Sequence, residues 1–234
     1  MSLRRIQEHW TFFGREDPLR SILQQGAGWD TDEFFHTGVL EIESVLQYVE
    51  SLHPLRSRAR ALDFGCGVGR LTQALALHFD KVRGVDISPS MIEHARRYNR
   101  HGARCEYVLN ETSDLGRFAD GEFDFIYSNI TLQHMPRRLI KRYLAEFLRV
   151  LDPAGALLFQ LPGAGRDKLT AVLSLAHNLY YRVVRPKTPV FPMHGIHKDD
   201  VIRFFTKRGG AVLDVTSDAW AGPHWKSFRY LVTR

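Results

Sequence analysis

Residues 62–70 combine glycines and a carboxylate in a pattern that suits a nucleoside ligand. They read Leu-Asp-Phe-Gly-Cys-Gly-Val-Gly-Arg, and a second carboxylate, Asp86, follows at the end of a later apolar run. Gly65 lets the chain turn sharply out of a strand, while Gly67 and Gly69 carry no side chain that would keep a ligand from the backbone. A carboxylate at a strand tip can accept hydrogen bonds from both hydroxyls of a ribose. The pattern therefore predicts a nucleoside-bearing cofactor.

The spacing of the glycines distinguishes this loop from two other nucleotide-binding loops. A dinucleotide fingerprint requires Gly or Ala five residues after its first glycine, and that position is Arg70 here. A P-loop requires Gly-Lys-Ser or Gly-Lys-Thr, and neither follows. The G-x-G-x-G order disfavours a dinucleotide and excludes a triphosphate loop.

Alternating strands and helices are expected to position this loop. Between residues 60 and 161, short apolar runs alternate with helical periodicity, which is typical of βαβ units around a parallel sheet. Strands are predicted at 60–64, 82–87, 104–109, 123–128 and 156–161, and helices at 68–79, 89–99 and 136–150. Ser88 is the expected N-cap of the second of these helices, with Pro89 at its first position.

The C-terminal part continues with one helix and two strands. A helix at 197–208 ends at Gly209-Gly210, and strands follow at 211–216 and 228–233. Because no helical segment separates these last strands, we expect an antiparallel hairpin with a wide connection at 217–226.

Two segments lie outside this alternation. Residues 1–58 are aromatic-rich and helical in pattern, with Thr31 or Thr37 as candidate helix caps. Residues 163–196 interrupt the sheet pattern and contain an apolar helical stripe that Pro186 ends. This insertion is expected to cover the carboxyl edge of the sheet, where open α/β sheets bind ligands. The predicted domains are an N-terminal helical cap at 1–58 and a Rossmann-like domain at 59–234, which includes the cap insertion at 163–196.

The composition indicates a folded, reduced protein. The chain has 234 residues, of which 44% are hydrophobic, enough to bury a full core. No stretch approaches the roughly 18 uncharged apolar residues of a membrane span, so we expect a soluble cytoplasmic protein that does not engage a membrane. Cys66 and Cys105 are the only cysteines, too few for a disulfide scaffold or a zinc cluster.

The formal net charge of +6 leaves two interpretations open. Clustered Lys and Arg side chains could bind nucleic acid or an acidic substrate. The basic residues are nevertheless dispersed, and the groups at 4–5, 137–142 and 207–208 each fall on the polar face of a predicted helix. A solvated helix face is the favoured interpretation, because a charge run alone rarely identifies a partner.

Four ordered motifs resemble the class I S-adenosylmethionine-dependent methyltransferases. They are the loop at 62–69, Gly84-Val85-Asp86-Ile87-Ser88 with Met91, the segment from Phe123-Asp124 to Asn129, and the segment at 148–155. The resemblance is strong over about residues 58–161. It implies a three-layer α/β sandwich with a seven-stranded, mostly parallel sheet whose last strand is antiparallel, and S-adenosyl-L-methionine as cofactor.

The resemblance also assigns cofactor contacts. Gly65 and Gly67 would approach the methionyl and ribose parts, and Asp63 would face the methionine ammonium group. Asp86 would bind the ribose diol, and Ile87 and Met91 would flank the adenine. The family often places an acidic residue after the third strand; Glu111 of Asn110-Glu111-Thr112 takes that position, with a solvated turn residue as the alternative. The expected cofactor-binding residues are Asp63, Gly65, Cys66, Gly67, Gly69, Asp86, Ile87, Met91, Glu111, Thr112 and Asn129.

His134 is the candidate catalytic residue. It follows Asn129, which ends the fourth predicted strand beside the expected point of methyl transfer. A neutral histidine can accept a hydroxyl proton near pH 7, whereas a helix-start or loop histidine is the structural alternative. His194 and His197 are weaker candidates for the same role.

Two further groups of residues have structural and functional interpretations. Aromatic and neighbouring residues of the N-terminal segment could close over the ligands, or simply form a helical core; they are Trp10, Phe13, Asp17, Trp29, Phe35 and Gly38. The histidines lack the spacing of a metal site, so no metal is predicted.

The sequence therefore predicts methyl transfer to a small-molecule acceptor, with an oxygen of a sugar or another secondary metabolite as the favoured acceptor atom. The covered pocket implied by the N-terminal helices and the insertion favours a small acceptor over a macromolecule. A tRNA or protein methyltransferase and a non-catalytic S-adenosylmethionine-binding module are the alternatives. The acceptor itself and the oligomeric state, monomer or homodimer, are not encoded in these motifs.

Overall fold

A seven-stranded sheet forms the centre of the computed structural model, which describes residues 2–23, 28–163, 193–222 and 225–234. The strand order is β3-β2-β1-β4-β5-β7-β6. The strands are β1 (Arg60–Phe64), β2 (Lys81–Asp86), β3 (Cys105–Leu109), β4 (Phe123–Ser128), β5 (Leu151–Pro162), β6 (Ala211–Asp218) and β7 (Ser227–Thr233). β7 pairs antiparallel with both β5 and β6, and the other pairs are parallel. The predicted fold class and the hairpin of the last two strands are confirmed.

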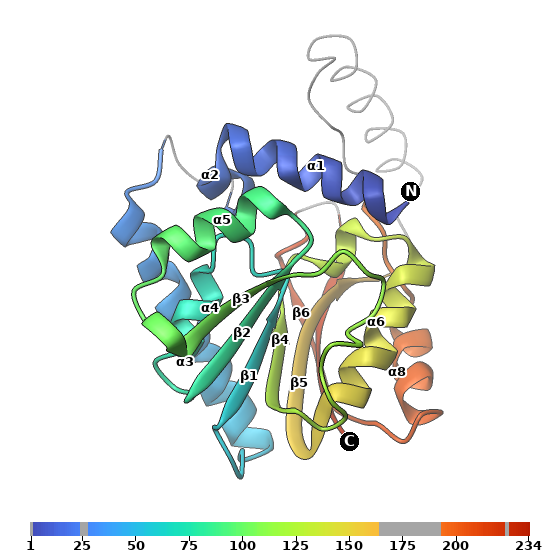
Figure 1. The fold of residues 1–234 in the computed structure, drawn as a ribbon. Coiled ribbons are helices and arrows are strands. Elements are labelled where there is room, and N and C mark those ends of the chain that lie inside the picture. The colour runs from blue at the N-terminus through green and yellow to red at the C-terminus, as the bar shows by residue number, and fades with distance from the viewer. Residues whose placement is uncertain (1, 24–27, 164–192, 223–224) are drawn as a thin grey trace.

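Helices cover both faces of the sheet (Figure 1). One face carries α3 (Thr31–Leu52), α4 (Arg70–Leu75) and α5 (Pro89–Tyr98), and the other carries α6 (Arg137–Val150) and α8 (Lys198–Thr206). Side chains of β1 alternate between the two cores, since Ala61 packs toward α3 and α4 while Leu62 packs toward α6. The sheet is therefore buried on both sides, as its near-continuous apolar strands require.

Two further helices lie across the carboxyl edge of the sheet. They are α1 (Leu3–Glu16) and α2 (Pro18–Ile22). α1 rests on α5, because the Ser90 hydroxyl donates to the carbonyl of Thr11 at 2.9 Å and the His94 ring donates to the carbonyl of Gly14 at 2.9 Å. A side chain at Gly14 would collide with Ser90, so this glycine permits the close approach of the two helices.

Local signals explain most helix boundaries. Ser88 caps α5 by accepting from the amide of Met91, and Pro89 occupies its first turn, both as predicted. The predicted caps Thr31 and Thr37 are wrong, because the Asp30 carboxylate accepts from the amides of residues 32 and 33 and begins α3 one residue earlier.

α4 is shorter than the helix predicted at 68–79. Gly69 has a left-handed φ of 86°, so the helix begins only after it. At the other end the amides of Leu77 and His78 bond to carbonyls three residues back, at Ala74 and Leu75. The last turn is therefore tightened, and α4 ends before the last apolar residue of the predicted stripe.

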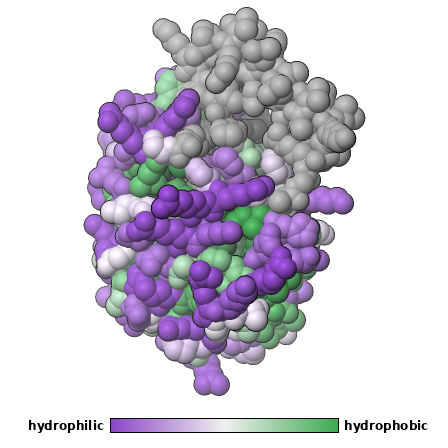
Figure 2. Space-filling view, turned by 90° about the vertical axis from the view of Figure 1, so that its right-hand side faces the viewer, coloured by the Kyte–Doolittle hydropathy of each residue, from purple (hydrophilic) through white to green (hydrophobic). Residues whose placement is uncertain are grey.

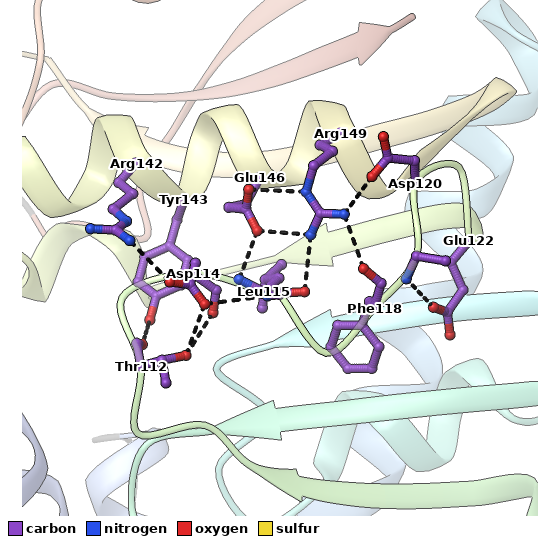
Figure 3. A network of polar contacts seen from close by, with 12 residues as sticks. Thr112, Asp114, Leu115, Phe118, Asp120, Glu122, Arg142, Tyr143, Glu146 and Arg149 are labelled. Carbon is purple, nitrogen blue, oxygen red and sulfur yellow. Dashed lines mark hydrogen bonds and ion pairs between the residues drawn. The ribbon is translucent and has the colours of Figure 1, made fainter.

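The connection from β3 to β4 contains no helix in the structure and is held by α6 instead. The Arg149 guanidinium donates five hydrogen bonds of 2.7–3.0 Å, to the carboxylates of Glu146 and Asp120 and to the carbonyls of Leu115 and Phe118 (Figure 3). Charge-assisted bonds of this kind replace the secondary structure that the connection lacks.

The outer face of α6 and α8 is mostly hydrophilic (Figure 2). Arg138 and Lys141 are exposed there, and Arg142 pairs with Asp114 at 3.0 Å. The apolar stripe predicted within 163–196 lies outside the described residues. None of the helices in the described part of the chain combines the length and apolar character that a membrane span needs.

Replacing Arg149 tests whether its hydrogen bonds hold the connection between β3 and β4; we call this set of hydrogen bonds the Arg149 clamp. Arg149→Lys is expected to lower the free energy of unfolding by about 1–3 kcal/mol, because a lysine cannot make the same fork of bonds and leaves loop carbonyls without donors. Urea unfolding measures the change. Arg138→Lys, an exposed change on the same helix, is the control and should stay within about 0.5 kcal/mol of the native protein. Equal effects of the two variants would contradict the role of the clamp.

Candidate functional site

The glycine loop is fixed to the end of β2 by backbone hydrogen bonds. The amides of Gly65 and Cys66 both donate to the carbonyl of Val85, at 2.7 and 3.0 Å. Gly65, Gly67 and Gly69 have positive φ angles of 82°, 52° and 86°. Such angles are strained for other residues, so the glycines are required here by conformation.

Asp86 joins the glycine loop to the start of α5. Its Oδ2 accepts from the amide of Gly67 at 2.9 Å, and its Oδ1 accepts from the amide of Ser88 at 2.8 Å. Burial raises the pKa of Asp86, and these backbone donors counteract the rise. Each carboxylate oxygen has a second lone pair, so Asp86 can still accept from a ligand.

Asp63 is a buried carboxylate at the end of β1. Thr72 of α4 donates to its Oδ2 at 2.6 Å. Burial raises the pKa of Asp63 to about 7, although Thr72 and the nearby Arg70 guanidinium act in the opposite direction. Asp63 is therefore poised to change its protonation state when a cation binds beside it.

The Cβ positions of the glycines face protein side chains. An added Cβ would lie 2.1 Å from the Thr131 hydroxyl at Gly65, 2.6 Å from Cδ1 of Ile22 at Gly67, and 2.5 Å from the Tyr107 hydroxyl at Gly69. α2 thus lies directly on the glycine loop, which the sequence pattern did not indicate.

A buried cluster of polar groups adjoins the loop on the α3 side. Glu41 of α3 pairs with Arg70 of α4 at 2.7 Å, and it accepts from the hydroxyl of Tyr127 at 2.9 Å and from the side-chain amide of Asn129 at 2.8 Å. We refer to Glu41, Arg70, Tyr127 and Asn129 as the Glu41 cluster. Sequence reasoning missed Glu41. The sequence feature that could have indicated Glu41 is an acidic residue within an otherwise apolar helical stripe, which includes Gly38, Ile42 and Val45.

The backbone is strained directly after Asn129. Ile130 has a φ of 57°, and it is the one non-glycine residue with positive φ in the described part of the chain. Its amide donates to Oε1 of Gln160 at 3.2 Å, and Gln160 in turn donates to Gln133 and Ser227. A β-branched residue in this conformation marks a position that the surrounding structure holds in place.

His134 lies in the short helix η2 (Leu132–His134), which follows β4 at the carboxyl edge. The Trp10 ring of α1 contacts the His134 ring edge-on, with centroids 5.3 Å apart. Burial lowers the pKa of His134 to about 4, and His194 adds to this effect. His134 is therefore neutral at physiological pH.

The two other candidate histidines lie differently. The amide of His194 donates to the carbonyl of Gln133 at 2.7 Å, which places this residue beside η2. His197 is exposed and caps α8 by accepting from the amide of Asp199. The structure brings His194, and not His197, to the site.

The predicted adenine residues line the junction of α1 with β2 and α5. Gln7 donates to the carbonyl of Ile87 at 3.2 Å and to the carboxylate of Glu111 at 2.7 Å. Met91 is buried beneath Gly14. These three predicted positions therefore lie together under α1.

Two predicted residues turn their side chains away from this edge. The Cys66 thiol is buried in the core on the α3–α4 face, so only its backbone belongs to the loop. The Thr112 hydroxyl donates to Asn110 and Asp114, and its carbonyl accepts from Tyr143 of α6 (Figure 3). No group of three or more potential ligands within the described residues is arranged to hold a metal ion.

Comparison with known proteins identifies the family. A sequence profile described as a methyltransferase domain matches residues 61–155. The chain is 29% identical over 169 residues to a ubiquinone biosynthesis O-methyltransferase of Xylella fastidiosa, covering 67% of this chain and 68% of that protein. The crystal structure of a magnesium protoporphyrin IX methyltransferase from Synechocystis with bound S-adenosylhomocysteine aligns over 100% of both chains, with a TM-score of 0.70 and 16% identity. Residues 61–155 form a methyltransferase domain, and the fold matches that of class I S-adenosylmethionine-dependent methyltransferases.

The matches with this methyltransferase span different shares of its relatives' lengths. It is 31% identical over 119 residues to a bifunctional biotin biosynthesis protein of Cellvibrio japonicus, where the match spans 51% of this chain and only 23% of that protein. The residues matched by the methyltransferase profile, 61–155, include the glycine loop and Asp86, and S-adenosylmethionine is the cofactor of the methyltransferase.

The site residues fit this cofactor. Asn129 has a buried Oδ1 that accepts no hydrogen bond from the described residues, and Asp63 and Asp86 supply carboxylates at the ends of the two neighbouring strands β1 and β2. An ammonium group and a ribose diol are donors that such acceptors would bind. The methyltransferase thus offers acceptors of the kind that the donor groups of the cofactor require.

The raised pKa of Asp63 predicts pH-dependent cofactor binding. Below about pH 7 the free methyltransferase carries a proton on Asp63, and the ammonium group of the ligand favours the ionised carboxylate. Affinity for S-adenosylhomocysteine should therefore rise between about pH 5.5 and 7.5, by no more than about tenfold per pH unit. Calorimetric titrations across this range measure it. Asp63→Asn should abolish this pH dependence of the affinity. If the native protein and the variant show the same dependence of affinity on pH, Asp63 is not its source.

Proposed function

We propose that the methyltransferase transfers a methyl group to an oxygen atom of a small-molecule acceptor, such as a sugar or another secondary metabolite. The observation that carries this proposal is a neutral, half-buried His134 at the carboxyl edge, close to Asn129 and in edge-on contact with the Trp10 ring. A hydroxyl acceptor must lose its proton during transfer, and a neutral imidazole can take it. The Xylella fastidiosa relative is a ubiquinone biosynthesis O-methyltransferase, which also favours oxygen as the acceptor atom.

The chain's own residues divide the work. When bound, S-adenosylmethionine supplies a methyl group already activated by its positively charged sulfur. Asp86 would hold the ribose diol, while Asp63 and Asn129 would hold the methionine ammonium group. Trp10 and the strained turn at Ile130 would exclude water and fix the loop from which His134 acts. Alignment of two reactants in this way contributes roughly 7–11 kcal/mol in favourable cases.

A transfer assay tests the function directly. Methyl-labelled cofactor is incubated with a panel of hydroxylated small molecules and with amine and thiol analogues. Labelled methyl ethers or esters are the expected products. Transfer only to nitrogen, sulfur or carbon would overturn the oxygen assignment, and tight cofactor binding without transfer to any acceptor would favour the non-catalytic alternative.

The role of Asp86 predicts a loss of nucleoside affinity. Asp86→Ala should weaken binding of S-adenosylhomocysteine about 10- to 100-fold, because the ribose loses a charged acceptor. Calorimetry gives the dissociation constant. Asp80→Ala is the control, since Asp80 is an exposed carboxylate just before the opposite end of β2 and should leave binding unchanged. Unaltered affinity of Asp86→Ala would remove Asp86 from the site.

The role of His134 predicts a loss of turnover without a loss of cofactor binding. His134→Ala should lower kcat about 10²- to 10⁴-fold, the range for general base catalysis, and leave the dissociation constant of S-adenosylhomocysteine within about twofold. His197→Ala is the control and should keep its turnover. Because the pKa of His134 is about 4, native kcat should show no decline attributable to this residue between about pH 8 and 6. Undiminished kcat in His134→Ala would exclude His134 as the base.

A further inference from the structure

We propose that Glu41 is a positioning residue for the methionine end of the cofactor. Its carboxylate orients the Asn129 amide so that Oδ1 faces the ligand's ammonium group. The inference rests on the proposed contact between Asn129 and the cofactor, and it assigns a role in binding to a helix that precedes the glycine loop.

The contacts of Glu41 use both oxygens of its carboxylate. Oε1 accepts from Nδ2 of Asn129 at 2.8 Å and from the Tyr127 hydroxyl at 2.9 Å, and Oε2 pairs with the Arg70 guanidinium at 2.7 Å. The side chains of Glu41 and Arg70 are only 11% and 4% exposed. One buried carboxylate therefore ties α3 to α4 and to the end of β4.

This arrangement permits a single orientation of the Asn129 amide. An ionised carboxylate only accepts hydrogen bonds, so the amide must present its NH₂ group to Glu41. A flipped amide would place Oδ1 against Oε1 of Glu41, and two acceptors at that distance repel each other. Glu41 thus fixes Oδ1 on the opposite side of the amide group.

The Asn129 oxygen that Glu41 fixes in place lacks a hydrogen-bond donor among the described residues. Oδ1 of Asn129 is buried and accepts no hydrogen bond from the described residues, a state that is unfavourable in a folded protein. Asn129 directly follows β4, and Asp63 is the penultimate residue of the adjacent strand β1. An ammonium group between them would donate to both side chains, as the methionine end of the cofactor can.

Arg70 is the counterion of the buried Glu41 carboxylate. Asp63, Asp86 and Glu41 bring three carboxylates to this region, and the pKa of Asp63 is raised by burial and also by the charges of Glu41 and Asp86. The Arg70 guanidinium opposes that effect and balances Glu41 at 2.7 Å. Arg70 therefore supplies a counterion to Glu41 next to the proposed ammonium site.

The test compares two ligands that differ only at the methionine end. S-adenosylhomocysteine carries the amino acid group, whereas 5′-methylthioadenosine shares the nucleoside and thioether but lacks that group. Glu41→Gln should weaken S-adenosylhomocysteine about 10- to 100-fold by calorimetry and change 5′-methylthioadenosine by less than about twofold. Glu43→Gln, an exposed change on the same helix, should alter neither.

A charge exchange tests the orientation itself. Asn129→Asp alone places a carboxylate against Glu41 and should weaken S-adenosylhomocysteine. Combined with Glu41→Gln it restores one donor facing one acceptor, with the donor now at position 41, and leaves an acceptor toward the ligand. The double variant should bind S-adenosylhomocysteine more tightly than either single variant, and the absence of this rescue would overturn the proposal.

The outcomes separate the inference from the proposed function. Equal weakening of both ligands by Glu41→Gln, or no weakening of either, overturns the role of Glu41. Asp86→Ala still weakens both ligands in that case if the proposed nucleoside site is right, and fails to do so if it is wrong. Thermal unfolding checks that each variant folds. If Glu41→Gln does not, Glu41→Asp keeps the charge beside Arg70, withdraws from Asn129, and should show the same ligand-selective loss.

Discussion

The turn after β1 is held against the tip of β2 by three backbone donors, and the remaining site geometry depends on this attachment. Two amides share the carbonyl of Val85, and a third donates to Asp86. The attachment sets where α4 begins, which in turn sets the reach of Arg70 and Thr72. A few hydrogen bonds at one strand end therefore place the α4 side chains that contact Asp63 and Glu41.

Burial of charge is the second constraint. Asp63 of β1 and Glu41 of α3 lie on the face of the sheet that α3 and α4 cover, where ionised groups are unfavourable without partners. Thr72 and Arg70 provide partial compensation. The part of this burial cost that remains uncompensated is expected where acceptors are retained to bind a ligand and not to stabilise the fold.

The sequence anticipates those features that short-range patterns determine. β1 and β4 have the predicted bounds, and the Ser88 cap is where its spacing placed it. The end of α4, the Asp30 cap and the direction of the Thr112 side chain depend on competition between neighbouring donors and acceptors. Glu41 was hidden for a different reason, since its partners are far away in the chain and only the packing of α3 brings them together.

The packing of α3 has a consequence for how such proteins can be recombined. The segment shared with other methyltransferase domains begins at residue 61, yet Glu41 and the buried stripe of α3 precede it and complete the core beside β1. A graft cut at residue 61 would leave Arg70 without its counterion and expose the face that Ile42 and Val49 cover. The transplantable unit starts at the Asp30 cap, so a chimera that exchanges the helices over the carboxyl edge should join the chains before that residue.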